Sequence, residues 1–327
     1  MIQPEPLLVT LVRQVDEIPE LSTPVLPQRG RPRVYTDRLI LKALLIMIVR
    51  RLYSASSLLS FLNQDTALTQ TLREMLMYEG QLASRRTWER RLKALPDGLP
   101  SEIGHIGRLL VQQIQPWQQT GRAVAVDSTP LRAKGGVWHK KHREQGLVPH
   151  STIDTEAGWS KSGYHGWWYG WKLHLACAVT SFWLPLAAEL TVANTDDASI
   201  APDLLAQLPA EVRYILGDTH YNTPDLRRIC QHTGRWLVAT RRGTYPHTDG
   251  GVEVRRIFHK LRSQAIEPFN GLFKNIFECG GQVPVKGVSR TRLFVLGAVL
   301  LYQLVLLYQF RSQKPLGLGI KSLLRAA

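Results

Sequence analysis

Cysteine is scarce in this sequence of 327 residues, which contains only Cys177, Cys230 and Cys279. The three are widely spaced and form no Cys-x-x-Cys pair, which argues against a disulfide framework and against a cysteine-based metal site. The apolar-poor start, Met1-Ile2-Gln3-Pro4, carries no secretory signal. These absences predict a protein of the reducing cytoplasm.

Acidic residues are also in short supply, with 26 Asp and Glu against 41 Lys and Arg, for a formal net charge of +15. Such a chain attracts polyanions, because each cation set against a phosphate releases counterions. Nucleic acid is therefore the first candidate partner, although membrane surfaces and ribosomes fit the charge as well. A hydrophobic content of 44% supports a core and excludes a disordered tail.

Only one long apolar run is present, from Leu293 to Phe310. It is just long enough to cross a membrane. Gln303, Gln309 and the lack of a second such run favour a helix buried against a sheet instead. We therefore expect no membrane partner.

Three short stretches each deliver one acidic residue: Asp127, Asp218 and Glu267. In the first two, a run of β-branched and apolar residues ends in Asp. This pattern is typical of a buried strand that places a carboxylate at its C-terminal tip, beside the crevice where open α/β sheets hold ligands. Three carboxylates brought to one spot repel one another unless cations lie between them, so the pattern indicates a site for paired Mg²⁺ ions.

These stretches resemble the catalytic core of insertion-sequence transposases of the DDE superfamily, roughly from Gly121 to Phe310. The resemblance extends to four further features, Gly170 to Leu175, Ala193 to Asp197, Tyr221 and Lys274. It implies an α/β fold with a ribonuclease-H-like mixed five-stranded sheet flanked by helices, in which Asp127, Asp218 and Glu267 are catalytic and hold the metal. The implied cofactor is two Mg²⁺ ions, with Mn²⁺ as a substitute, and the implied partner is double-stranded DNA at transposon ends and target. A homo-oligomer on DNA, with a dimer favoured, is also implied.

The family signature around the Glu has Arg four residues before it and Tyr three residues before that Arg. Here these places hold Ser263 and Lys260, and Arg262 stands one position out of register. Lys260, Glu267 and Lys274 share a helix face. A basic stripe of this kind suits contact with the DNA backbone, so Lys260, Arg262 and Lys274 are predicted to bind DNA.

The first part of the chain is expected to be all helical after a Pro-rich, irregular arm over residues 1–33. Helices are predicted over 37–62 and 66–77, with a third beginning after Ser84. That third helix places Arg86, Arg90 and Lys93 opposite an apolar face. It fits either the groove-reading helix of a helix-turn-helix or an ordinary basic surface helix.

The remaining patterns predict five strands and three helices in the order β-β-β-α-β-α-β-α, in agreement with the resemblance. A long irregular stretch from Leu131 to Tyr169 is expected to be functional because of its length. The predicted domains are a helical DNA-binding region over 1–120, a catalytic domain over 121–310 and a basic tail over 311–327. The expected strands cover 122–129, 171–179, 184–192, 212–218 and 236–241, and the expected helices cover 197–207, 223–232 and 257–277.

Several residues allow two interpretations. His139, His142 and His150 suggest zinc, but solvated loop histidines fit better because no closed tetrahedral set is present. The aromatic cluster around Trp167 and Trp171, beside Lys161 and Lys172, suits stacking on unpaired bases, although a core role for Trp171 is the more common one. Asp154 and Asp197 are extra acids that are not expected to be ligands. Pro268 either kinks the last helix or begins it at Glu267, and Glu253 and Glu278 are the rival third acids.

The function predicted from these features is a DNA transposase that cleaves at transposon ends and transfers the freed 3′ end into target DNA. Two alternatives stay open, a ribonuclease-H-like nuclease without strand transfer and an inactive DNA-binding relic of a transposon. The expected location is the cytoplasm, in association with the nucleoid.

Overall fold

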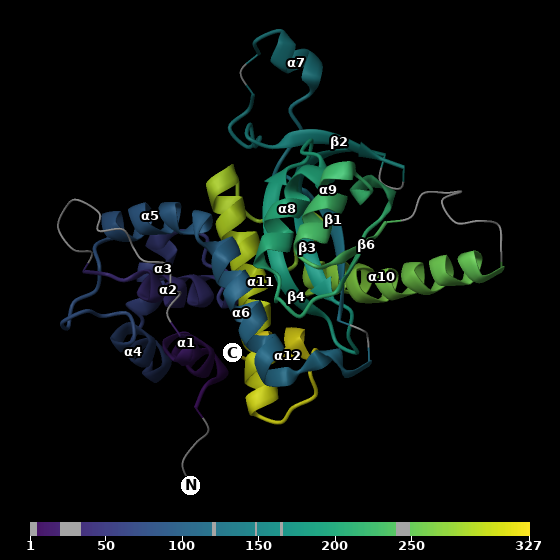
Figure 1. Ribbon diagram of the computed structural model, residues 1–327. Helices are drawn as coiled ribbons and strands as arrows, with labels where there is room; N and C mark the ends of the chain where they lie inside the picture. Colours follow the sequence, from purple (N-terminus) through teal and green to yellow (C-terminus); the bar gives the residue numbers. More distant parts are fainter. Residues whose placement is uncertain (1–4, 20–33, 120–121, 148, 164–165, 240–248) are drawn as a thin grey trace. The chain divides into compact units, whose positions relative to one another are not determined.

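The computed structural model (Figure 1) describes residues 5–19, 34–119, 122–147, 149–163, 166–239 and 249–327. Internal contacts divide the chain into two units, Met1–Glu102 with Arg292–Ala327, and Ile103–Thr291. The sequence predicted boundaries near 120 and 310 instead, and the functions assigned to those segments stay predictions. Residues 120 and 121, where the first boundary was expected, lie outside the described residues.

The first unit begins with α1 (Leu7–Glu17), where the sequence predicted an irregular arm. That prediction is wrong for these residues, because Pro6 and Pro19 flank the helix without interrupting it. Leu8, Leu11 and Val15 recur at helical spacing and are buried. The rest of the predicted arm, 1–4 and 20–33, lies outside the described residues.

The single helix predicted over 37–62 is two helices, α2 (Asp37–Val49) and α3 (Ala55–Leu62). The chain turns between them at Arg51, whose φ is 56°, and Ser54 then caps α3 by accepting a hydrogen bond of 3.0 Å from the Ser57 amide. Two further capped helices follow, α4 (Ala67–Glu74) after Thr66 and α5 (Arg85–Ala94) after Ser84. The last two helix starts agree with the prediction.

The long apolar run forms α11 (Val288–Arg311), which is long and apolar enough to cross a membrane by length and composition. Within its most apolar window, however, 83% of the helix is buried inside the protein. Gly297 lies directly against α2, where an added Cβ would come within 2.8 Å of the Leu44 and Ile48 side chains. The predicted basic tail is not simply a tail, since it includes α12 (Ile320–Ala326), which packs against α1.

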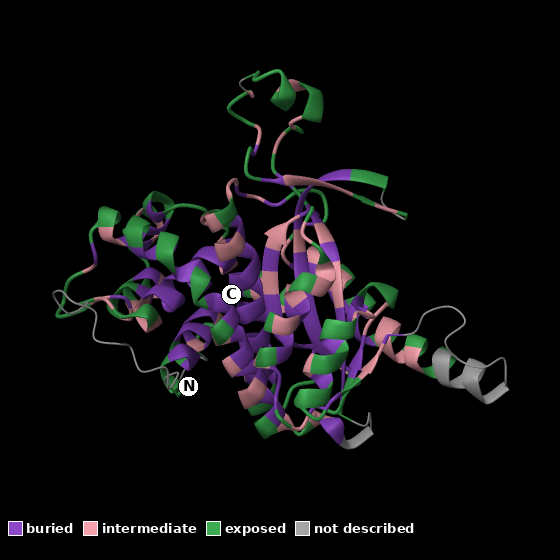
Figure 2. Ribbon diagram, turned by 45° about the horizontal axis from the view of Figure 1, so that its top comes forward, coloured by how far each residue is buried: buried purple, intermediate pink, exposed green. Residues whose placement is uncertain are grey.

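The second unit is built on a mixed sheet with β2, β3, β1, β5 and β6 in spatial order, and with β4 also paired to β3. β1 pairs antiparallel with β3 and parallel with β5, and β5 pairs parallel with β6. The apolar runs of β1, β3 and β4 are buried, as expected for central strands (Figure 2). The strands are β1 (Ala123–Arg132), β2 (Gly158–Ser162), β3 (Gly166–Ala178), β4 (Leu184–Val192), β5 (Tyr214–Leu216) and β6 (Trp236–Val238).

β1 continues beyond Asp127, so this carboxylate does not stand at a strand tip as predicted. β5 pairs with β1 only as far as Ala125, and from Val126 onward β1 keeps β3 as its paired neighbour. The proline at position 130 is tolerated there because the strand has one free side. Asp127 therefore faces the place where β5 ends. The sequence pattern predicted a carboxylate at this crevice, but at the tip of its strand and not within it.

The stretch from Leu131 to Tyr169, predicted as irregular, contains the end of β1, the short helix α7 (Lys140–Glu144), β2 and the start of β3. β2 pairs with the first residues of β3, from Gly166 to Gly170, while β4 pairs with the rest of β3. The prediction missed these elements because β2 carries no alternating apolar pattern and is stabilised by its pairing with β3.

Helices α6 (Leu99–Ile114), α8 (Asp197–Gln207), α9 (Pro224–His232) and α10 (Asp249–Ile276) complete this unit. α8 contacts β4, β3 and β1, α9 contacts β6, and α10 contacts β1, β3 and β5. Side chains of 249–255, including the rival acid Glu253, lie outside the described residues, as do 240–248.

α10 runs through Pro268, so the helix does not begin at Glu267. A proline cannot donate to the carbonyl four residues before it, which here belongs to Gln264. The indole N–H of Trp183, just before β4, donates to this carbonyl at 3.3 Å. This hydrogen bond replaces the missing helical one and ties α10 to the turn between β3 and β4.

Candidate active site

Asp127 is the most buried of the three predicted acids, with 23% of its side chain exposed. One carboxylate oxygen accepts a hydrogen bond of 2.8 Å from the Ser128 amide, and the other accepts one of 2.9 Å from Arg262. Burial raises the pKa of Asp127 to about 6, and the Arg262 guanidinium and the Ser128 N–H oppose this increase only in part. The charges of Asp218 and Asp197 raise the same pKa further.

Glu267 lies on α10 with 59% of its side chain exposed. Its carboxylate accepts a hydrogen bond of 3.0 Å from the Ser263 hydroxyl, one helical turn earlier. The second terminal nitrogen of Arg262 lies 3.8 Å from the same carboxylate oxygen. Arg262, although out of register with the family signature, thus bridges Asp127 and Glu267.

Asp218 follows β5 and begins the 3-10 helix Thr219–Tyr221. Its two oxygens interact with His220: the backbone N–H donates at 2.9 Å and the ring Nδ1 lies at 3.0 Å. The Asp218 carboxylate raises the pKa of His220 through this hydrogen bond and through its charge. The acid is therefore held in a defined orientation at the end of β5.

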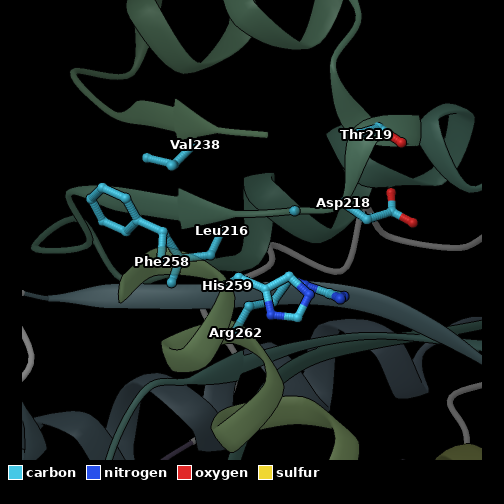
Figure 3. Close-up of a pocket in the computed structure, with 8 residues that line it drawn as sticks. Leu216, Asp218, Thr219, Val238, Phe258, His259 and Arg262 are labelled. Carbon is cyan, nitrogen blue, oxygen red and sulfur yellow. The ribbon is translucent and has the colours of Figure 1, made fainter. Parts of the chain in front are cut away.

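A cavity of about 220 Å³ lies between the ends of β5 and β6 and one face of α10. Figure 3 shows Asp218 at its edge, Leu216 and Val238 on the strands, and Phe258, His259 and Arg262 on α10. Arg262 lines this cavity together with Asp218 and also contacts Asp127 and Glu267. One guanidinium therefore contacts two of the predicted acids and lines the cavity beside the third.

A polar cluster supports the Asp127 segment from α8 and β3. Asp197 accepts a hydrogen bond of 3.0 Å from the Ser128 hydroxyl and one of 2.9 Å from Lys172. His174 is fully buried, with Nε2 2.8 Å from the Thr191 hydroxyl and Nδ1 3.6 Å from Asp197. Burial lowers the pKa of His174, so its imidazole is neutral near pH 7.

The sequence contained a signal for this cluster that its interpretation did not use. Lys172 and His174 are two residues apart on a strand of otherwise apolar residues, so they point to the same face of the sheet. Two polar side chains on one face of a buried strand need a partner. The sequence could not show that this partner is Asp197, since that pairing depends on how α8 packs on the sheet.

Tyr221 is buried, and within the described part of the chain its hydroxyl has no hydrogen-bond partner. Burial raises its pKa, and the charges of Asp127, Asp197 and Asp218 act in the same direction. The ring packs closely on Gly217, where an added Cβ would lie 2.9 Å from the Cβ of Tyr221. An unpaired phenol O–H is thus buried near three carboxylates.

Among the described residues, no group of three His, Cys, Asp or Glu side chains lies close enough together to hold a metal ion. The donor chemistry nevertheless fits hard divalent cations, which take carboxylate oxygens. The cation that bridges two of the carboxylates in this structure is the Arg262 guanidinium. Asp127, Asp218 and Glu267 supply oxygens of this kind.

The structure places the other predicted DNA contacts on two helices. Arg86, Arg90 and Lys93 are exposed on α5, while Trp88 and Leu92 on the same helix are buried. On α10, Lys260 is exposed and Lys274 is half-buried, and burial lowers the pKa of Lys274. The two lysines lie on the helix that carries Glu267, as predicted.

Two alternatives weighed from the sequence can be compared with the structure. The rings of His139 and His142 stack edge to face with centroids 5.7 Å apart, and these histidines join no cluster of three metal-binding side chains in the described part of the chain. Trp171 is fully buried, whereas 64% of Trp167 is exposed. Asp154 is buried and accepts a hydrogen bond of 2.9 Å from the Gly287 amide.

Comparison with family models matches residues 118–304 to the transposase DDE domain, more than half of the chain. The chain therefore belongs to the DDE superfamily of transposases. Comparison with curated proteins gave no match. A solved structure with some similarity is the crystal structure of a pre-cleavage Mos1 transpososome, at 11% sequence identity over 92% of this chain and 85% of that chain, with a TM-score of 0.22. The family assignment depends on the domain match alone.

Proposed function

We propose that this protein is a DNA transposase that cleaves at the ends of its mobile element and transfers the freed 3′ ends into target DNA. The observation that carries the proposal is the position of Arg262, which contacts Asp127 and Glu267 and lines the same cavity as Asp218. Two of the acids share one cation, and the third lines the same cavity, in a chain of the DDE family.

In this proposal the acids provide a site for phosphodiester chemistry. When bound, a pair of Mg²⁺ ions would supply activation of the attacking oxygen and stabilisation of the departing one. Asp127, Asp218 and Glu267 would hold the ions. Arg262, which contacts Asp127 and Glu267, would be available to bind a phosphate of the DNA backbone, a group that guanidinium recognises well. His220 would keep Asp218 oriented.

The proposal includes a ribonuclease-H-like fold for the catalytic domain. Its support is the order of elements, because β1, β3, β4, α8, β5, α9, β6 and α10 follow one another as the sequence resemblance implied. The mixed pairing, antiparallel from β4 to β1 and parallel from β1 to β6, also agrees.

We further propose that the helical N-terminal region recognises the element's ends through α5. The three exposed cations on its surface support this role, because the apolar face of the same helix is buried. Arg86→Ala and Arg90→Ala should each lower the affinity for the terminal repeat by about 1 to 3 kcal/mol if they contact bases. Equal losses of affinity for a duplex of random sequence would indicate that the two arginines contact phosphates. No loss of affinity for either duplex would indicate that α5 is an ordinary surface helix.

The proposed partners are transposon-end and target DNA, bound by a homo-oligomer with a dimer favoured, in the cytoplasm at the nucleoid. The net charge of +15 supports a polyanionic partner.

The experiment is a cleavage and joining assay on DNA that carries the inverted repeats flanking the coding region, with Mg²⁺ or Mn²⁺. Asp127→Asn, Asp218→Asn and Glu267→Gln should eliminate cleavage while binding of end DNA is nearly unchanged. Ca²⁺ should support binding without chemistry, given its looser coordination. Glu278→Gln is the matched control, because Glu278 follows the end of α10.

The two alternatives give different outcomes. Cleavage without any joined product would indicate a nuclease. Binding of the ends without cleavage under either metal would indicate an inactive relic.

A further inference from the structure

The segment between β1 and β3 is held in a defined conformation by contacts with the rest of its unit. We call residues 133–163 the arm; it contains α7 and β2 and projects from the sheet at the top of Figure 1. Its base is fixed to the segment after α10, where Gly135 and Gln282 exchange two hydrogen bonds of 3.1 and 2.9 Å and Lys134 donates to the Pro284 carbonyl at 2.6 Å. The arm therefore starts from a fixed point.

Gly135 is required at this base for two reasons. Its φ is +84°, in the left-handed region that other residues rarely adopt. An added Cβ would also lie 2.2 Å from the Thr152 carbonyl oxygen. The chain thus returns to Gly135 at Thr152, where the two backbones lie in direct contact.

An aromatic stack connects the sheet to α7. Tyr169 on β3 packs against Trp159 on β2 with ring centroids 5.3 Å apart, and Trp159 packs against His139 at 6.0 Å. The Trp159 indole also donates to the Trp138 carbonyl at 2.8 Å. These contacts hold the start of α7 against the sheet. In an irregular loop the same aromatic side chains would be exposed to water.

The acidic residues of the arm are engaged in contacts of their own. Asp154 is buried and Glu156 accepts a hydrogen bond of 2.6 Å from the Val288 amide. Glu144 lies 3.6 Å from Lys140 on the same helix. The carboxylates of Asp154 and Glu156 are thus hydrogen-bonded at the base of the arm, and Glu144 has a cation beside it.

Basic residues dominate the outer part of the arm. Between positions 135 and 147 the sequence has three Lys and Arg and a single acid, Glu144. Lys140, Lys141 and Arg143 are all exposed on α7, in the region that Figure 2 colours mostly as exposed. Arg143 also lies over the Trp138 ring at 5.7 Å, which limits its freedom before any partner binds.

We propose that the arm is a second DNA-binding surface, at which Lys140, Lys141 and Arg143 contact the phosphates of a duplex outside the carboxylate site. This inference rests on the proposed function. A fixed base, acids that are hydrogen-bonded within the protein and an exposed basic helix together suit a partner with regularly spaced negative charge. Duplex backbone fits better than unpaired bases, because the aromatic rings of the stack are used within the arm.

The test compares two triple variants that remove the same charge. One is Lys140→Gln, Lys141→Gln and Arg143→Gln. Its control is Arg213→Gln, Arg227→Gln and Arg228→Gln, which removes three exposed cations elsewhere in the same unit. The probe is a fluorescently labelled duplex of random sequence, titrated with full-length protein over a range of KCl concentrations without divalent metal.

Each lost phosphate contact should lower the slope of log affinity against log salt by about 0.9, and so weaken binding about fivefold at 0.15 M salt. Loss of all three contacts predicts a slope smaller by about 2 to 3 and an affinity lower by about 100-fold. The control variant should change both quantities much less. The double variant Lys140→Gln with Lys141→Gln retains Arg143 over Trp138 and should give about two thirds of the change in slope. It controls for the possibility that the triple variant disrupts the structure of the arm.

Three outcomes would overturn the proposal. The arm and control variants could weaken duplex binding equally, which would make the effect one of net charge. The arm variant could bind duplex like the wild type, or lose affinity only for single-stranded DNA. Wild-type protein that binds no DNA would refute the proposed function as well, whereas wild-type binding with an unaffected arm variant refutes the arm alone.

Discussion

Replacement of the buried carboxylate of Asp127 should stabilise the metal-free protein while it eliminates the proposed activity. Burial raises the folded-state pKa of Asp127 from 3.8 to about 6. The folded protein therefore binds a proton more readily than the unfolded chain, so this group's contribution to stability falls as pH rises from the unfolded pKa through the folded one. A difference of about 2 pKa units corresponds to about 3 kcal/mol lost by about pH 8.

Asp127→Asn keeps the shape of the side chain but removes the charge and leaves a single acceptor oxygen, so the hydrogen bond from either Ser128 or Arg262 is lost at every pH. We expect the variant to exceed the wild type in free energy of unfolding by up to about 3 kcal/mol near pH 8. Near pH 4 most of the wild-type carboxylate is already protonated, so the gain should shrink to below about 1 kcal/mol. The charge that Asn removes is also the charge that a divalent cation would bind.

Urea unfolding of both proteins with a metal chelator, followed by fluorescence at several pH values, measures this difference. Asp203→Asn is the control, since Asp203 is exposed on α8. Addition of Mg²⁺ should stabilise the wild type and leave Asp127→Asn unchanged. A difference in unfolding free energy between the two proteins that does not change in favour of Asp127→Asn between pH 4 and pH 8 would refute the assignment of a buried, unfavourable charge to Asp127.

Three further predictions concern the surroundings of this carboxylate. Arg262→Gln should destabilise the metal-free protein more near pH 8 than near pH 4, because the guanidinium lowers the pKa of Asp127. Equal losses in unfolding free energy at both pH values would contradict this prediction. Asp197→Asn should lower the free energy of unfolding in urea by about 3 kcal/mol, because it leaves the Lys172 ammonium without its carboxylate. The double variant with Lys172→Met should recover part of that loss. Additive losses in the double variant would show that the two residues are not coupled. Trp183→Phe should lower the free energy of unfolding by about 1 kcal/mol, because it removes the donor to the Gln264 carbonyl. The loss should be clearly smaller in a Pro268→Ala background, where the helix supplies its own donor. The same loss in both backgrounds would rule out this role for the Trp183 indole.

Some features were set by local chemistry, and the sequence determined them alone. β4 and α8 have the bounds that the patterns predicted, because a continuous apolar run and an Asp at the N-cap act over a few residues. The α5 start after Ser84 is determined in the same way. The domain match confirms the superfamily that the three acids and their flanking residues indicated.

Tertiary structure decided the features that depend on partners far away in the chain. β1 extends past Asp127 because β3 continues beside it after β5 ends, and β2 exists because β3 offers it an edge. α10 passes through Pro268 with help from Trp183, which lies 81 residues from the carbonyl it satisfies. The sequence showed Lys172, His174 and Asp197 without showing that they meet, since burial and pairing are set by packing of the whole sheet rather than by neighbouring residues.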